Sequence, residues 1–144
     1  MGIRFLKIAA VYLAIGVSMG LAMGITQNFT LHAVHAHINL LGWATMALAG
    51  LIYVQFPQAA ETRLAKIHFW MHNLALPVMM VSLALLMSGV PQAVYFLEAG
   101  STTMVVGIMT FVVNVCLSVK PETHRRSNDR TAPLPSLAAG ATSR

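Results

Sequence analysis

Charged residues are scarce in this chain of 144 residues. Only 9% of them are Asp, Glu, Lys or Arg, whereas 57% are hydrophobic. Because an ordinary soluble domain carries about a quarter of its residues as charges, this composition excludes a typical soluble protein. It indicates a membrane protein, whose apolar side chains face lipid.

Cysteine and acidic residues are also rare. With one cysteine, Cys116, the chain forms no intrachain disulfide, and without a CxxCH motif it holds no covalently attached c-type heme. The formal net charge of +5 would suit nucleic acid, but basic residues on a membrane protein more often report its topology. We therefore expect no nucleic-acid partner.

Long apolar runs fill most of the chain. Each is about 20 residues long, which is enough to span the hydrocarbon core of a bilayer as a helix. The runs cover residues 8–25, 34–56, 67–89 and 101–119. They predict an all-α fold, a four-transmembrane-helix bundle with antiparallel neighbours, which forms one domain over residues 1–119. Residues 120–144 lack apolar periodicity and predict a disordered basic tail suited to contact with membrane lipid.

The basic residues predict the orientation of this bundle. Arg4 and Lys7 precede the first run, Arg63 and Lys66 separate the second from the third, and Lys120 begins the basic tail, whereas the other two loops contain no Lys or Arg. By the positive-inside rule, both termini are expected in the cytoplasm, with the first run an uncleaved anchor. The expected location is a bacterial inner membrane.

Small residues recur along the first run. Gly16, Gly20 and Gly24 are spaced four apart, so they share one helix face and favour close contact with a neighbouring helix.

Histidines provide the candidate chemistry, because ionisable residues inside a membrane are costly and commonly functional. His35 and His37 open the second run, and His68 and His72 open the third. Residues two apart on a helix diverge by about 200°, so His35 and His37 are expected to serve two sites. Residues four apart share a face, so His68 and His72 could bind one metal or line one groove.

Depth separates the two histidine pairs. From the rise of 1.5 Å per residue, His37 and His72 are expected to lie about 20 Å apart along the membrane normal. A neighbouring subunit is then the natural source of a second ligand. The face that continues from His35 through Asn39, Gly42 and Met46 is polar and small, which leaves room for a flat ligand or a close helix.

The segments HAHINLLGW and HFWMHN resemble those of small four-helix membrane proteins related to subunit I of heme-copper oxidases and nitric oxide reductases. In that superfamily, subunit I has twelve helices in three arcs of four, and a His-x-His pair on the second helix of an arc holds two hemes. The resemblance implies heme b bound by His35 and His37, with His72 and His68 as second-rank ligands. It also implies a homotrimer that supplies twelve helices.

The chain lacks the tandem His-His pair and the HPEVY-like segment of that superfamily. Complete oxygen reduction with proton pumping is therefore not expected. The predicted function is that of a heme b-binding protein for electron transfer or for binding of a small gas such as NO or O₂.

Two alternatives belong to other functional classes. A copper-handling protein could use thioether and imidazole groups, which suit copper(I), from Met19, Met23 and His32 together with the His-x-His pair. A structural assembly subunit would use its histidines only for hydrogen bonds between helices.

Overall fold

The computed structural model describes residues 1–119, and the predicted tail with His124 lies outside this range. The described chain is helical throughout, apart from short connections. Four of its helical segments are long and apolar enough to span a membrane, which confirms the predicted fold class. The elements are α1 (Gly2–Thr26), α2 (His32–His37), η1 (Ile38–Thr45), α3 (Met46–Gln55), α4 (Pro57–Ala60), α5 (Arg63–Met87), η2 (Pro91–Ala93) and α6 (Val94–Ser118).

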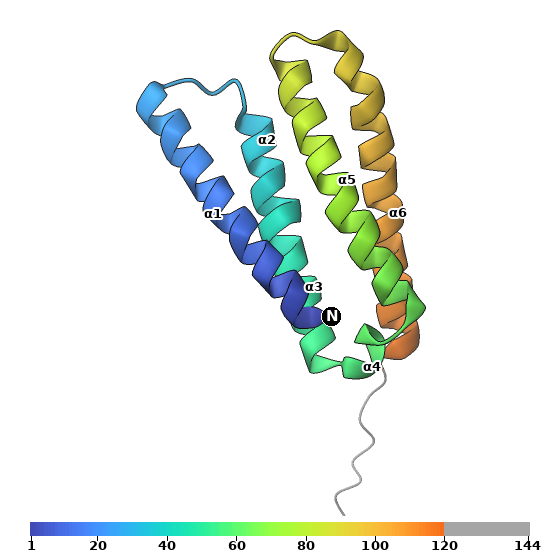
Figure 1. Cartoon of the computed structure of the whole chain (residues 1–144). Coiled ribbons are helices and arrows are strands. Elements are labelled where there is room, and N and C mark those ends of the chain that lie inside the picture. Colours follow the sequence, from blue (N-terminus) through green and yellow to red (C-terminus); the bar gives the residue numbers. More distant parts are fainter. Residues whose placement is uncertain (120–144) are drawn as a thin grey trace, which may run out of the picture.

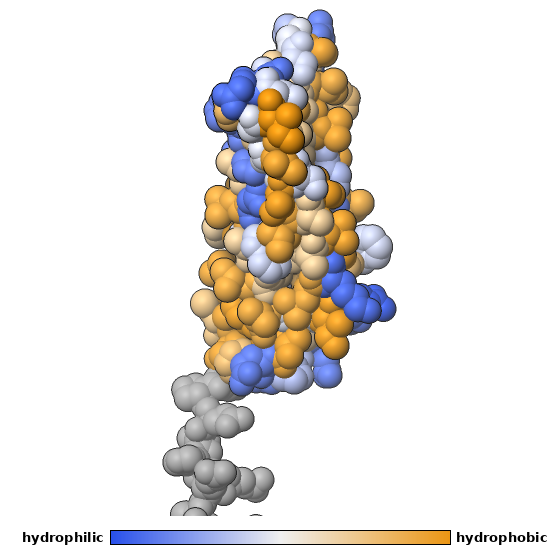
Figure 2. Space-filling view, turned by 90° about the vertical axis from the view of Figure 1, so that its left-hand side faces the viewer, coloured by the Kyte–Doolittle hydropathy of each residue, from blue (hydrophilic) through white to orange (hydrophobic). Residues whose placement is uncertain are grey.

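Two helical hairpins lie side by side (Figure 1). In the first, α1 packs against the continuous segment formed by α2, η1 and α3, and in the second α5 packs against α6. The middle segment and α5 are the more central, since 39% of their spanning residues are buried, against 17% for α1 and 22% for α6. Hydrophobic side chains dominate the face that α1 presents (Figure 2), as expected for a surface in contact with lipid.

The helices begin two to seven residues earlier than the apolar runs predicted. The largest shift is at α6, which starts at Val94, because the polar-looking segment after Pro91 is already helical. At the other end of the bundle, Phe56 terminates α3 and Pro57 begins the short helix α4, as expected for a residue without a backbone N–H. Thr62 then caps α5 by accepting a hydrogen bond from the backbone N–H of Ala65 at 3.0 Å.

The two ends of the bundle differ in charge. One end holds the N-terminus, α4 and the end of α6 (Figure 1), and its residues include Arg4, Lys7, Arg63 and Lys66. We call this the basic end. The opposite end holds the connections from α1 to α2 and from α5 to α6, which contain no Lys or Arg, and we call it the far end.

Close packing along the glycine face of α1 is confirmed at two of its three positions. A Cβ atom added to Gly16 would lie 2.5 Å from Oδ1 of Asn39, and one added to Gly20 would lie 2.8 Å from Cε1 of His35. No atom lies within 4 Å of a Cβ placed on Gly24, where the two helices have separated.

Substitution of these glycines tests the contact. Because alanine at Gly16 overlaps Asn39, we expect Gly16→Ala to lower the free energy of unfolding by about 1–3 kcal/mol. The matched control Gly24→Ala should be neutral or stabilising by a few tenths of a kcal/mol, since alanine is the better helix former and meets nothing there. Thermal unfolding in detergent measures both, and equal melting temperatures for the two variants would contradict the packing described.

The π-helix η1 interrupts the second span. Such wide turns are rare and frequently occur at functional sites. This one follows His37 directly and presents the backbone carbonyl of Leu41 to α5, where it accepts a hydrogen bond from His72. It therefore links the His-x-His segment to the histidine pair of α5.

Candidate functional site

His35 is a residue of α2 whose partly buried side chain contacts α1. Its Nδ1–H donates a hydrogen bond to the carbonyl oxygen of Gly16 at 3.0 Å, and its ring fits against Gly20. Asn39, one turn further along, donates to the backbone carbonyl of His35 at 2.9 Å. With Nδ1 protonated, the imidazole has a free lone pair on Nε2.

His37 is held by its own helix. Its Nδ1–H donates to the carbonyl oxygen of Ala33 at 2.8 Å, and the side chain stays partly exposed. Its Nε2 therefore also carries a free lone pair. A histidine ligand of a metal usually donates its other ring N–H in this way, which fixes the tautomer and the ring orientation. Both histidines have the donor chemistry of an axial heme ligand.

The face from His35 through Asn39, Gly42 and Met46 turns out to be covered by α1. The Tyr12 ring lies directly over Gly42, 2.7 Å from where a Cβ would be, and Met46 is fully buried in a cluster with α1 residues. Of the two uses left open by the sequence, a flat ligand or a close helix, the structure has the close helix.

His68 and His72 lie in the core, 1% and 0% exposed. The His68 ring is packed between Phe5 and Phe111, with ring centroids 5.0 and 4.9 Å away. Nε2–H of His72 donates to the carbonyl oxygen of Leu41 at 3.1 Å. Their role as second-rank heme ligands stays a prediction, and the heme site proposed below consists of His35 and His37 alone.

His72 reaches the segment that follows His37. Its Nε2–H bonds to the carbonyl oxygen of Leu41, four residues after His37, and α5 begins four residues earlier than its apolar run. The depth separation of about 20 Å between His37 and His72 stays a prediction.

A buried polar cluster at the basic end was missed by the sequence analysis. Asn114 of α6, fully buried, donates to the carbonyl oxygen of Ala59 at 2.9 Å and to the Tyr53 hydroxyl at 3.4 Å. It accepts from Thr62 at 2.7 Å and from Ser118 at 3.2 Å. An asparagine within the apolar segment FVVNVCL was the available signal, because a polar side chain at that depth requires partners.

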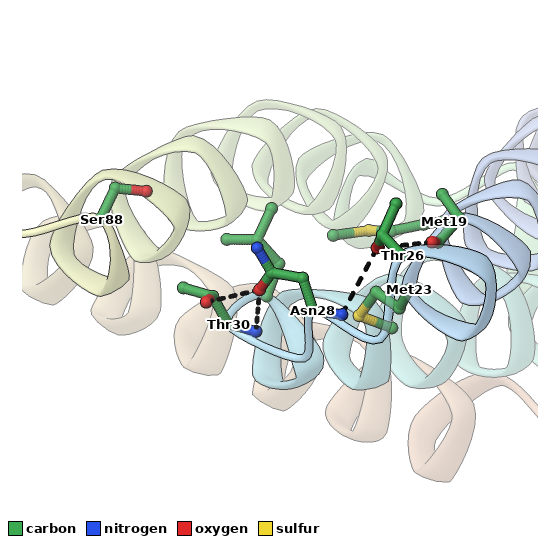
Figure 3. A pocket seen from close by; sticks show the side chains of 8 residues that line it. Met19, Met23, Thr26, Asn28, Thr30 and Ser88 are labelled. Atoms are coloured by element: carbon green, nitrogen blue, oxygen red, sulfur yellow. Dashed lines mark hydrogen bonds between the residues drawn. The ribbon is translucent and has the colours of Figure 1, made fainter.

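A cavity of about 350 Å³ at the far end brings Met19 and Met23 together (Figure 3). Asn28 and Thr30 supply polar groups to the same cavity and bond to one another at 2.7 Å. His32 is not among the lining residues; it is exposed, and its ring N–H donates to the carbonyl oxygen of Phe29. The structure thus joins the two methionines of the copper hypothesis and leaves out its histidine.

Within residues 1–119, no group of three or more His, Cys, Asp or Glu side chains is placed to hold a metal ion. No family model, curated protein or solved structure matches the chain.

Proposed function

We propose that this chain is a membrane heme b protein, with His37 and His35 as axial ligands. One observation supports this most strongly: both imidazoles donate Nδ1–H to a backbone carbonyl and keep Nε2 free. When bound, the heme would supply a redox-active iron that carries an electron or binds a small gas such as NO or O₂. The protein would hold the imidazole rings of His35 and His37 in place and exclude water from the iron.

His37 is the leading ligand of the two. It is partly exposed at the surface of the bundle, so a porphyrin can approach Nε2 without displacing a helix. His35 lies against Gly20 of α1, and a porphyrin there must lie outside the contact between α1 and α2. The different surroundings of the two imidazole rings support two separate heme positions.

A second copy of the chain would cover a porphyrin at His37 and provide its other ligand. We propose a homotrimer, because three copies would supply the twelve helices of the resembled subunit I. The apolar outer surfaces of α1 and α6 are compatible with either lipid or a neighbouring copy.

The basic end is proposed to face the cytoplasm of a bacterium, at its inner membrane. The distribution of charge supports this, since Arg4, Lys7, Arg63 and Lys66 all lie at that end and the far-end connections contain no Lys or Arg.

The second candidate function is copper handling at the far-end cavity. The shared placement of Met19 and Met23 favours it, since thioether sulfur is a ligand of copper(I). Electron transfer would then play no part, and the protein would hold or pass on an ion.

An optical spectrum with a metal analysis separates the two candidates. For detergent-purified protein we expect a Soret band that shifts on reduction, and iron in stoichiometric amount. Protein without a Soret band but with stoichiometric copper, lost in Met19→Leu and Met23→Leu, would support the copper function. Protein with neither would overturn both.

A further inference from the structure

We propose that Tyr53, His68 and His72 form a proton path that leads from a cavity at the basic end to the middle of the bundle. The path is independent of heme binding. It uses none of the proposed heme ligands, and it connects four segments of the chain: α3, α5, α6 and η1.

The path begins at Tyr53. This side chain is only 2% exposed, yet it lines a cavity of about 550 Å³ at the basic end, together with Arg4 and Glu61. Arg4 and Glu61 are both exposed, so this end of the cavity is in contact with water. In the proposed path, a proton enters from this cavity at Tyr53.

The hydrogen bonds of Tyr53 define a direction. Its oxygen accepts from the side-chain amide of Asn114 at 3.4 Å, so its own O–H is free to donate to Nδ1 of His68 at 3.2 Å. With Nδ1 accepting, the proton of the neutral His68 ring is on Nε2. Asn114 is a positioning residue here, since it orients the hydroxyl without carrying the proton.

The hydrogen bond of His72 extends the path in the same direction. Its Nε2–H donates to the carbonyl oxygen of Leu41, which leaves Nδ1 as a bare acceptor. That Nδ1 is buried and has no hydrogen-bond partner among the described residues. Such an orphan is costly in an apolar core, and the group it lacks is a donor such as Nε2–H of His68.

Among the described residues, no hydrogen bond joins His68 directly to His72. Their ring centroids are 5.5 Å apart and the rings are nearly perpendicular, a separation that a single bridging water or a ring rotation can span. The transfer then balances: Tyr53 takes a proton from cavity water and gives one to Nδ1 of His68, and His68 gives its Nε2 proton to Nδ1 of His72. His72 keeps the added proton as an imidazolium.

The surroundings confine the proton to this route. The side chains that face the two histidines include Phe5 of α1 and Phe111 of α6, and Phe69 packs against Phe5. Tyr12 of α1, which borders both core clusters, and Tyr53 are the titratable side chains that pack there from other elements. Of the charged side chains in the described part of the chain, Arg4, Lys7, Glu61, Arg63 and Lys66 lie at the basic end, and Glu98 lies on α6 near the far end.

The test is the rate at which Nδ1 of His68 and of His72 gains and loses a proton, measured by ¹⁵N NMR relaxation on full-length protein in lipid vesicles. We expect the neutral rings to carry their proton on Nε2, and the proton that adds at Nδ1 to arrive through Tyr53. In Tyr53→Phe, exchange at the two histidines should slow by at least about tenfold, the factor that corresponds to one lost hydrogen bond. His68→Phe keeps an aromatic ring between Phe5 and Phe111, and it should slow proton exchange at His72 as much as Tyr53→Phe does.

Tyr12→Phe is the matched control, because it removes a phenol from another spanning helix and should leave both rates unchanged. Proton exchange at Nδ1 that is equally fast or faster in both Tyr53→Phe and His68→Phe would overturn the path, as would an Nδ1 of His72 that gains no proton at all in the native protein. Because none of these measurements depends on bound heme, failure of the proton path would be distinct from failure of the heme proposal.

Discussion

His37→Ala is expected to purify without most of its heme. His37 supplies a free Nε2 fixed by the hydrogen bond from its Nδ1–H to Ala33. Substitution of a group that merely orients a ligand already costs about 10–100-fold in affinity, so loss of the ligand itself should cost more than tenfold. The Soret absorbance per mole of protein measures the loss.

Three further variants make this result specific. His32→Ala should keep the wild-type spectrum, because His32 is exposed and bonds only to the local carbonyl of Phe29. His35→Ala should lose heme as well, independently of His37→Ala. His37→Gly should regain its band when free imidazole is added. If His35→Ala and His37→Ala both keep the native heme content, the assigned ligands are wrong.

Asn114→Leu is expected to cause the largest loss of stability among the polar substitutions within the spans. Asn114 joins α6 to α3 and α4 through Tyr53 and Ala59, and it accepts from Thr62. Hydrogen bonds between membrane helices contribute about 0.6 kcal/mol each on average, and the substitution removes three bonds that Asn114 makes outside its own helix. We expect a loss of about 2 kcal/mol or more in the free energy of unfolding.

Asn73→Leu is the matched control for this prediction. Its amide donates to the carbonyl oxygen of Phe69 within the same helix, so its removal should cost less than about 0.5 kcal/mol, with no effect on contacts between helices. Unfolding in a denaturing detergent, followed by circular dichroism, compares the two variants. Equal losses would mean that Asn114 does not connect the hairpins.

Some properties of the histidines follow from the local sequence, and others depend on helix packing. The divergence of His35 and His37 follows from helical geometry, and the structure has His35 against α1 while His37 bonds within its own helix. The tautomer of each ring, however, depends on which carbonyl lies nearby. The carbonyl of Gly16 is 19 residues away in sequence from His35, so only helix packing could reveal it.

The sequence by itself determined that the chain is a four-helix membrane bundle, because apolar runs, prolines and glycines act through local geometry and through the cost of exposing charge to lipid. It also located Gly16 and Gly20 on the packed face of α1. Only the tertiary structure decided that His72 reaches η1 and that Tyr53, His68 and Asn114 share one buried cluster. These contacts join different spans, and their existence depends on how the two hairpins pack.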